Sequence, residues 1–231
     1  MGLQSLLEYD RQLLLLFNGS NNLFADHWMS ILTSGFTWIA LYIALLILVI
    51  RNNASVSQIL LIVGSSLLCV LLAGGVSDLI VKPLVGRLRP CNDPVLCNAV
   101  HVVKRYHASD FSFFSAHAAN TFSIAVFFCW LVKSRLLGAG LVAWSLLNCY
   151  TRLYLGLHYP FDIIVGLAWG FLVGTGVWFL YLRVLRRLSP DNGVASSQYM
   201  PKGYNHTDVC VVLLVLVLIL VYSILRALFF F

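Results

Sequence analysis

The sequence predicts an all-α polytopic membrane protein, with six transmembrane helices and an N-terminal amphipathic helix, and three observations support this fold class. Of the 231 residues, 60% are hydrophobic and 10% are charged, and the mean hydropathy is +0.88, which leaves too little polar surface to cover a soluble globule. Six apolar windows are long enough to cross about 30 Å of hydrocarbon. Few of the connections are long, so residues 1–231 are expected to form a single membrane-embedded domain.

The elements follow in order along the chain. Residues 2–18 alternate apolar pairs with polar side chains at helical spacing, which is typical of a helix lying in the membrane interface. The expected spans are residues 28–50, 58–77, 111–132, 136–151, 163–182 and 209–225. The fourth window is the shortest of the six. Six crossings place the loops at 78–110 and 152–162 on one side of the membrane.

The loops on the other side, at 51–57, 133–135 and 183–208, carry basic residues. By the positive-inside rule this favours a cytoplasmic position. The side with the loops at 78–110 and 152–162 holds nearly as many basic residues. The rule therefore decides the orientation only if the basic residues on that side are kept there for catalysis. The net charge of +6 arises from side chains at span ends, where lipid headgroups and topology explain them, and no nucleic-acid partner is expected.

The first polar stretch at a span end is KPLVGRLRP, residues 82–90. Pro83 and Pro90 are expected to stop the helix and to hold Lys82 and Arg89 in defined positions. Asp78 lies four residues before Lys82 on the same helix face, which predicts an ion pair. Alone, the stretch would equally suit a basic cluster that snorkels to the headgroups.

The second stretch is FSAH, residues 114–117, at the start of the third span. Ser115 is a candidate N-cap, which would direct the backbone amides of Ala116 and His117 out of the helix start. Such a helix terminus is a natural anion site. In isolation, an ordinary cap followed by an interfacial histidine explains the stretch as well.

The third stretch is TRLYLGLHYPFD, residues 151–162. Pro160 fits the first turn of the fifth span, and this places Asp162 in that turn. His158 then lies just before the helix, within reach of Asp162. A carboxylate beside an imidazole fixes its tautomer and stabilises the imidazolium, as expected for a nucleophilic or basic histidine.

The three stretches share one side of the membrane, which favours a common site. Three cationic side chains, a helix N-terminus and two histidines suit a multiply charged anion, and phosphate is the favoured one. If one histidine attacks and the other protonates a leaving oxygen, the site can transfer a phosphoryl group.

These residues resemble the three-part signature of the type 2 phosphatidate phosphatase superfamily, which also contains the vanadium haloperoxidases. The internal spacing of all three parts agrees, and the motif region covers about residues 82–162. Phe114 and Ala116 stand where the family usually has proline and glycine, and Thr151 stands where it has serine. None of these changes removes a catalytic side chain.

The resemblance implies a reaction that needs no metal or other cofactor. His158 would attack phosphorus to form a phosphohistidine, Asp162 would orient it, and His117 would protonate the leaving oxygen and then activate water. The residues expected to hold the phosphoryl oxygens are Lys82, Arg89, Ser115, Ala116 through its amide, and Arg152.

The family further implies a bacterial lipid phosphatase of the inner membrane, with the site facing the periplasm and a membrane lipid as substrate. Our first interpretation is conversion of undecaprenyl diphosphate to undecaprenyl phosphate, with lipid A, phosphatidylglycerol phosphate and phosphatidate as alternatives. Transfer of the phosphoryl group to another lipid is also open. A non-catalytic lipid-phosphate carrier is the alternative of another class.

Three smaller features complete the sequence-based expectations. Cys91 and Cys97 share a loop, which leaves two alternatives open: a local disulfide, or two thiols. GLAWGFLVG, residues 166–174, repeats glycine at every fourth position, which predicts close internal helix packing. Four loop residues are expected to be solvated, with contact to a lipid headgroup as the alternative: His101, Lys104, Arg105 and His107.

Overall fold

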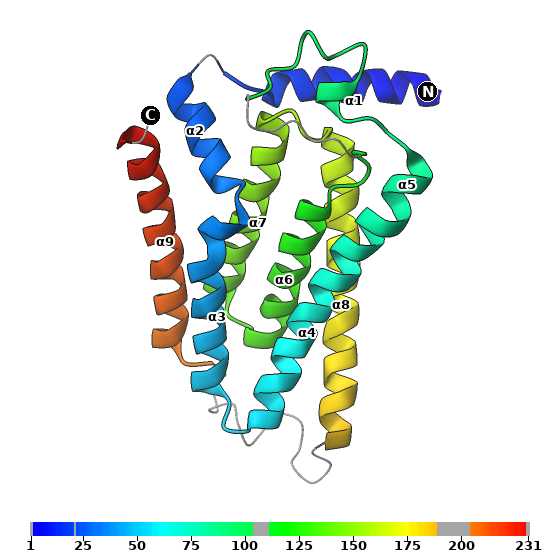
Figure 1. The fold of residues 1–231 in the computed structure, drawn as a ribbon. Helices are drawn as coiled ribbons and strands as arrows, with labels where there is room; N and C mark the ends of the chain where they lie inside the picture. Colours follow the sequence, from blue (N-terminus) through cyan, green and yellow to red (C-terminus); the bar gives the residue numbers. More distant parts are fainter. Residues whose placement is uncertain (1, 21, 104–110, 189–203, 230–231) are drawn as a thin grey trace.

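The computed structural model describes residues 2–20, 22–103, 111–188 and 204–229, and this part of the chain is helical with connecting loops. The elements are α1 (Leu3–Phe17), α2 (Leu23–Leu32), η1 (Gly35–Trp38), α3 (Ile39–Asn52), α4 (Val56–Gly75), η2 (Val76–Val81), α5 (Lys82–Val85), η3 (Pro90–Asn92), α6 (Ala116–Val132), α7 (Arg135–Tyr154), α8 (Pro160–Leu188) and α9 (His206–Phe229). The long helices run side by side as a bundle, and α1 lies across one end of it (Figure 1).

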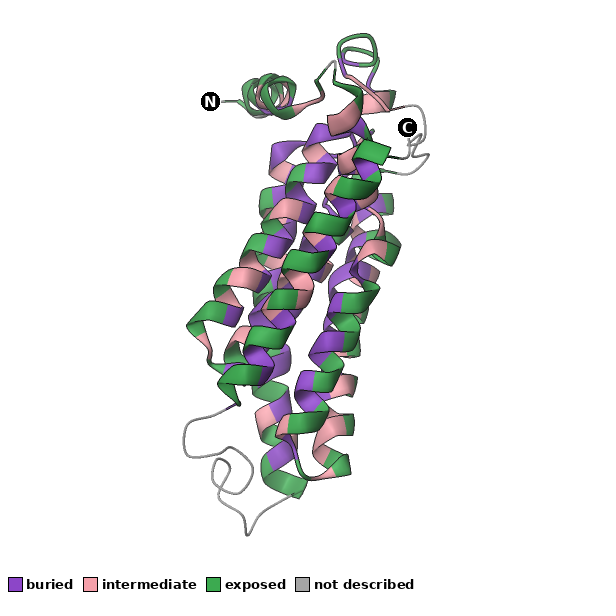
Figure 2. Cartoon of the chain, turned by 90° about the vertical axis from the view of Figure 1, so that its left-hand side faces the viewer, coloured by how far each residue is buried: buried purple, intermediate pink, exposed green. Residues whose placement is uncertain are grey.

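The described residues contain four helical stretches that are long and apolar enough to cross a membrane: Gly35–Asn52, Val56–Asn92, Pro160–Leu188 and His206–Phe229. Figure 2 shows exposed residues along the outer faces of the helices, and many of them are large and apolar, among them Leu60, Leu67 and Leu71 of α4. The chain is therefore an integral membrane protein. Length and composition do not establish α6 and α7 as the remaining two of the six expected spans, because α6 has 17 residues and α7 is less apolar.

The first expected span, 28–50, is wrong in its boundaries, because the helix is broken in the middle. The chain leaves α2 at Thr33, passes through η1 and resumes as α3 at Ile39. Two side chains stabilise the break by donating to carbonyls at the end of α2: Thr37 Oγ1 to Ile31 O at 2.5 Å and Trp38 Nε1 to Leu32 O at 2.8 Å.

The expectation that Pro83 stops the helix is also wrong. The chain is π-helical from Val76 to Val81, continues through Lys82 and Pro83, and ends only at Gly86, which has a φ of 62°. The wider π-helical turn before the proline relieves the clash that its ring would make in a regular α-helix. Pro90 does begin a new short element, η3.

The predicted close packing of the glycine repeat is confirmed, and α8 meets α6 through it. A Cβ atom on Gly166, Gly170 or Gly174 would lie within 2.7 Å of a backbone carbonyl oxygen of α6. Only glycine permits this separation, because no real Cβ atom makes such a contact.

The helix predicted at the N-terminus is present as α1, but its polar side chains are not all exposed. Asp10 is fully buried against the bundle, and Arg11 contacts Asp93 with Nη2 and Oδ2 3.0 Å apart. Leu16 and Phe17 are exposed instead. The exposed surface of α1 therefore includes large apolar side chains, although Leu14 of the same helix is fully buried.

Candidate active site

The helix ends and loops that carry the sequence-predicted residues lie at the end of the bundle that α1 covers (Figure 1). Lys82 begins α5, Ser115 and Ala116 begin α6, and Arg152 lies in the last turn of α7. His117 interacts electrostatically with a common group, namely Lys82, Arg89, Arg152 and His158. The structure therefore brings together the residues of all three motifs.

His158 lies in the loop before α8 and is 1% exposed. Its Nδ1 lies 3.6 Å from Asp162 Oδ2, which is longer than a hydrogen bond, and its Nε2 lies 3.4 Å from Arg89 Nη1. Burial, and then the charges of Arg152 and Arg89, lower the pKa of His158 to about 4 against the opposing effect of Asp162. At neutral pH the imidazole is uncharged, and Nε2 is the nitrogen that faces the cations.

Asp162 is held in one orientation by donors on both carboxylate oxygens. Oδ2 accepts from the Tyr159 N–H at 3.0 Å and from Ser112 Oγ, and Oδ1 accepts from Arg87 Nη1 at 2.9 Å. The carboxylate is fully buried. A buried charge with this many donors is fixed in place rather than solvated.

Each of the three cations is buried and has an identified contact. The predicted ion pair is confirmed, because Lys82 Nζ lies 2.7 Å from Asp78 Oδ1. Arg89 Nη1 donates to the carbonyl of Leu157 at 3.1 Å. These contacts orient charges that burial would otherwise make costly.

Arg152 connects the site to a neighbouring helix. Its Nη1 donates to Oγ1 of Thr33 at 2.8 Å, and Thr33 is the C-cap of α2. The break between α2 and α3 therefore supplies a partner for one of the phosphate-binding candidates.

The predicted N-cap of α6 is confirmed at Ser115. Its side chain accepts from the Ala118 N–H at 3.4 Å, and its own N–H donates to the Asp162 carbonyl at 3.1 Å. The amides of Ala116 and His117 belong to the first helical turn, whose N–H groups have no acceptor within the helix. The helix start is thus tied to the first turn of α8, and the His117 side chain is exposed.

Sequence reasoning missed four residues around the site: Asp10, Thr33, Arg87 and Ser112. Arg87 and Ser112 bind Asp162, and Asp10 binds Arg87 with Oδ2 and Nη2 2.7 Å apart. One signal was available, because Asp10 lies one turn before the buried Leu14. An acidic residue in the buried stripe of an amphipathic helix indicates a polar partner.

The loop features have mixed outcomes. Cys91 and Cys97 are thiols, not joined by a disulfide. His101 Nε2 lies 2.9 Å from Asp26 Oδ2, which engages it within the protein. Lys104, Arg105 and His107 lie outside the described residues. Within the described ranges no group of three or more His, Cys, Asp or Glu side chains is placed to hold a metal.

Comparison with known proteins agrees with the site geometry. The family described as the PAP2 superfamily matches residues 59–186. A lipid A 4′-phosphatase of Bacteroides thetaiotaomicron is 35% identical over 97% of this chain and 100% of its own length. A lipid A 4′-phosphatase of Porphyromonas gingivalis is 31% identical over 78% of this chain and 76% of its own.

A further relative is an undecaprenyl-diphosphatase of Bacillus subtilis, which is 31% identical over 52% of this chain and 60% of its own length. No solved structure matches the chain.

Proposed function

Because the chain belongs to the PAP2 superfamily and is a membrane lipid phosphatase, we propose that it hydrolyses a phosphate ester of lipid A through a phosphohistidine on His158. The observation that carries the choice of substrate is the similarity to two lipid A 4′-phosphatases over most of the chain. The undecaprenyl-diphosphatase relative covers a smaller part. Our first interpretation, undecaprenyl diphosphate, therefore becomes the second candidate.

In the first step, Nε2 of His158 attacks phosphorus, and the bond between phosphorus and the leaving sugar oxygen breaks. His117 gives its proton to that oxygen, which leaves as a hydroxyl. The orientation of His158 supports this, because Nδ1 faces Asp162 and Nε2 faces Arg89. Asp162 stabilises the ring as it gains positive charge.

In the second step, His117 takes a proton from water, and the water oxygen attacks the phosphohistidine. The phosphorus–nitrogen bond breaks, which releases inorganic phosphate and restores His158. Lys82, Arg89 and Arg152, together with Ser115 and the Ala116 amide, hold the phosphoryl oxygens and stabilise the transition-state charge. These cations and amides serve in place of a metal, and no cofactor is required.

For the membrane arrangement, we propose six spans, with α6 and α7 as the third and fourth. The helices that would cross the membrane run together in the bundle, and they are α3, α4, α6, α7, α8 and α9 (Figure 1). The site would face the periplasm of a bacterial inner membrane, where lipid substrates present their headgroups.

The test is phosphate release by the purified protein in detergent. The panel is lipid A, undecaprenyl diphosphate, phosphatidylglycerol phosphate and phosphatidate, each in excess EDTA and beside His158→Ala. We expect the fastest release from lipid A, with the 4′-phosphate lost as judged by mass spectrometry. The variant should be slower by about a thousandfold or more.

The other outcomes are informative. Preferred release from undecaprenyl diphosphate would assign the second candidate. Activity that EDTA abolishes would contradict the metal-free mechanism. Activity retained in His158→Ala would contradict the phosphohistidine.

A further inference from the structure

A buried bridge of three side chains connects α1 to the catalytic carboxylate. Asp10 Oδ2 lies 2.7 Å from Arg87 Nη2, and Arg87 Nη1 lies 2.9 Å from Asp162 Oδ1. Both carboxylates are fully buried. One guanidinium thus joins an acid of the N-terminal helix to the acid beside His158, and we call this arrangement the Asp10–Arg87–Asp162 bridge.

The surroundings of the bridge are equally specific. The other oxygen of Asp10, Oδ1, accepts from the N–H of Phe161 at 2.9 Å, one residue before Asp162. The Arg87 guanidinium carbon lies 3.7 Å from the ring centroid of Tyr159, the residue after His158. Asp10 therefore holds both the arginine and the backbone that position Asp162.

The bridge is more than is needed to attach α1 to the bundle. Other contacts already hold α1, since Leu14 is fully buried and Arg11 Nη2 lies 3.0 Å from Asp93 Oδ2, which also accepts from the Tyr159 hydroxyl at 2.8 Å. Burial raises the pKa of Asp10, despite its hydrogen bonds to Arg87 and Phe161. Burying an acidic side chain costs more free energy than burying an apolar one of similar size. We therefore expect the charge of Asp10 to have a use in the protein.

We propose that Asp10 and Arg87 are positioning residues for the phosphatase reaction. Asp10 holds one nitrogen of the Arg87 guanidinium, so that the other nitrogen points at Asp162. Arg87 then fixes the orientation of the Asp162 carboxylate and partly neutralises its charge. Asp162 in turn aligns His158. This inference rests on the proposed function only through the role of His158 and Asp162. It makes α1 part of the catalytic unit, although neither residue touches the substrate.

The first experiment compares kcat and KM for Asp10→Asn, Arg87→Gln and Arg87→Lys. We expect kcat to fall about tenfold in Asp10→Asn and further in Arg87→Gln, with KM near the wild-type value. Lysine keeps the charge but has no second arm, so Arg87→Lys should fall between the wild type and Arg87→Gln. It also carries the test if Arg87→Gln does not give monodisperse protein.

Two controls come from the same helix. Glu8→Gln makes the same charge change as Asp10→Asn, but Glu8 is exposed and lies 3.7 Å from Arg11 of the same helix. Arg11→Gln removes the contact of α1 with Asp93 and leaves the three members of the Asp10–Arg87–Asp162 bridge unchanged. An Asp10→Asn loss no larger than the loss in either control would overturn the proposal, because it would then reflect interface charge or docking of α1. Wild-type kcat in Asp10→Asn or in Arg87→Gln would overturn it as well.

A second readout needs no substrate, so it remains valid if the proposed lipid is wrong. Side-chain NMR titration of His158 reports the field of Asp162. Removing the Arg87 charge leaves Asp162 free to favour the imidazolium, so the pKa of His158 should rise in Arg87→Gln. It should fall in Asp10→Asn, where Arg87 has only Asp162 to neutralise. An unchanged pKa of His158 in Arg87→Gln would overturn the proposal.

Discussion

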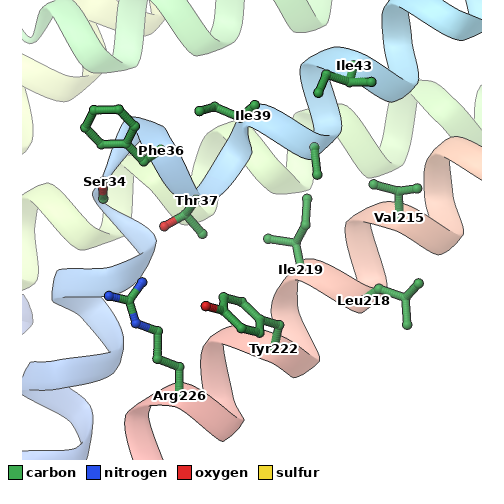
Figure 3. A pocket seen from close by; sticks show the side chains of 11 residues that line it. Ser34, Phe36, Thr37, Ile39, Ile43, Val215, Leu218, Ile219, Tyr222 and Arg226 are labelled. Atoms are coloured by element: carbon green, nitrogen blue, oxygen red, sulfur yellow. The ribbon is translucent and has the colours of Figure 1, made fainter. Parts of the chain in front are cut away.

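The contact between α6 and α8 and the contact between α3 and α9 are built in opposite ways. Along α8, glycines bring the backbone against carbonyl oxygens of α6. Between α3 and α9 lies an open groove of about 660 Å³, lined by branched aliphatic side chains such as Ile43 and Val215, with Thr37, Tyr222 and Arg226 towards one end (Figure 3).

The more closely packed of the two helix contacts is the one that carries predicted site residues. The α6–α8 pair carries Ser115 and Asp162, which are joined through the backbone by the Ser115 N–H and the Asp162 carbonyl, 3.1 Å apart. The groove contains none of the predicted catalytic residues. Close backbone packing therefore fixes the reacting groups, whereas the α3–α9 side tolerates looser packing.

The largest expected effect comes from a matched pair of glycine substitutions. In Gly170→Ala the new Cβ would lie 2.6 Å from the carbonyl oxygen of Ala119, and in Gly140→Ala it would lie 2.6 Å from Cδ2 of Leu213. A leucine methyl can rotate away, but a helix backbone cannot. We expect Gly170→Ala to cost about 1 to 3 kcal/mol or more of the free energy of unfolding and most of the activity.

Gly140→Ala should stay near the wild type, because alanine also favours the helix by about 1 kcal/mol. Thermal unfolding in detergent, together with phosphate release, measures both. Gly140 lies in α7 and faces Leu213 of α9. Equal destabilisation of the two variants would therefore contradict the claim that the backbone contact of α8 with α6 tolerates less change than a side-chain contact made by α9.

This contrast also marks what sequence could predict. The motif residues and the glycine repeat were predictable because spacing along a helix fixes which side chains share a face or an end. Arg87 and Thr33 were not, because their contacts depend on how α5 ends at Gly86 and where α2 breaks. Tertiary packing determines where these helices end, and the hydrophobic periodicity of the sequence does not predict it.

The next effect is the pH dependence of stability on the catalytic side. The pKa of His158 is lowered by burial from its ordinary value of 6.5 to about 4. Below pH 6.5 the unfolded chain binds a proton that the folded protein does not. Stability present above pH 6.5 is therefore lost as the pH falls through 4, by about 3 kcal/mol at most.

Thermal midpoints at pH 7 and pH 4.5 test this linkage against His158→Gln. The variant has no imidazole to protonate, so its midpoint should fall less on acidification. An equal fall in both proteins would assign the acid sensitivity to other groups.

A smaller effect is expected at Thr33, the C-cap of α2, which contacts Arg152 of α7. Thr33→Val keeps the shape but removes the acceptor for Arg152, whereas Thr33→Ser retains a hydroxyl. We expect kcat/KM to fall about tenfold in the valine variant, as for a lost hydrogen bond to a charged group. Equal kinetics in the two variants would show that Thr33 does not position Arg152.

The smallest effect should come from the groove itself, through a matched pair of isoleucines. Ile43 lines the groove and is 52% exposed, whereas Ile124 of α6 is 8% exposed. Ile43→Ala should change the free energy of unfolding by about 0.5 kcal/mol or less, and Ile124→Ala should cost about 2 kcal/mol or more. If Ile43→Ala were as costly as Ile124→Ala, the α3–α9 side would be tightly packed too. The placement of the catalytic groups on α6 and α8 would then need an explanation other than the rigidity of that pair.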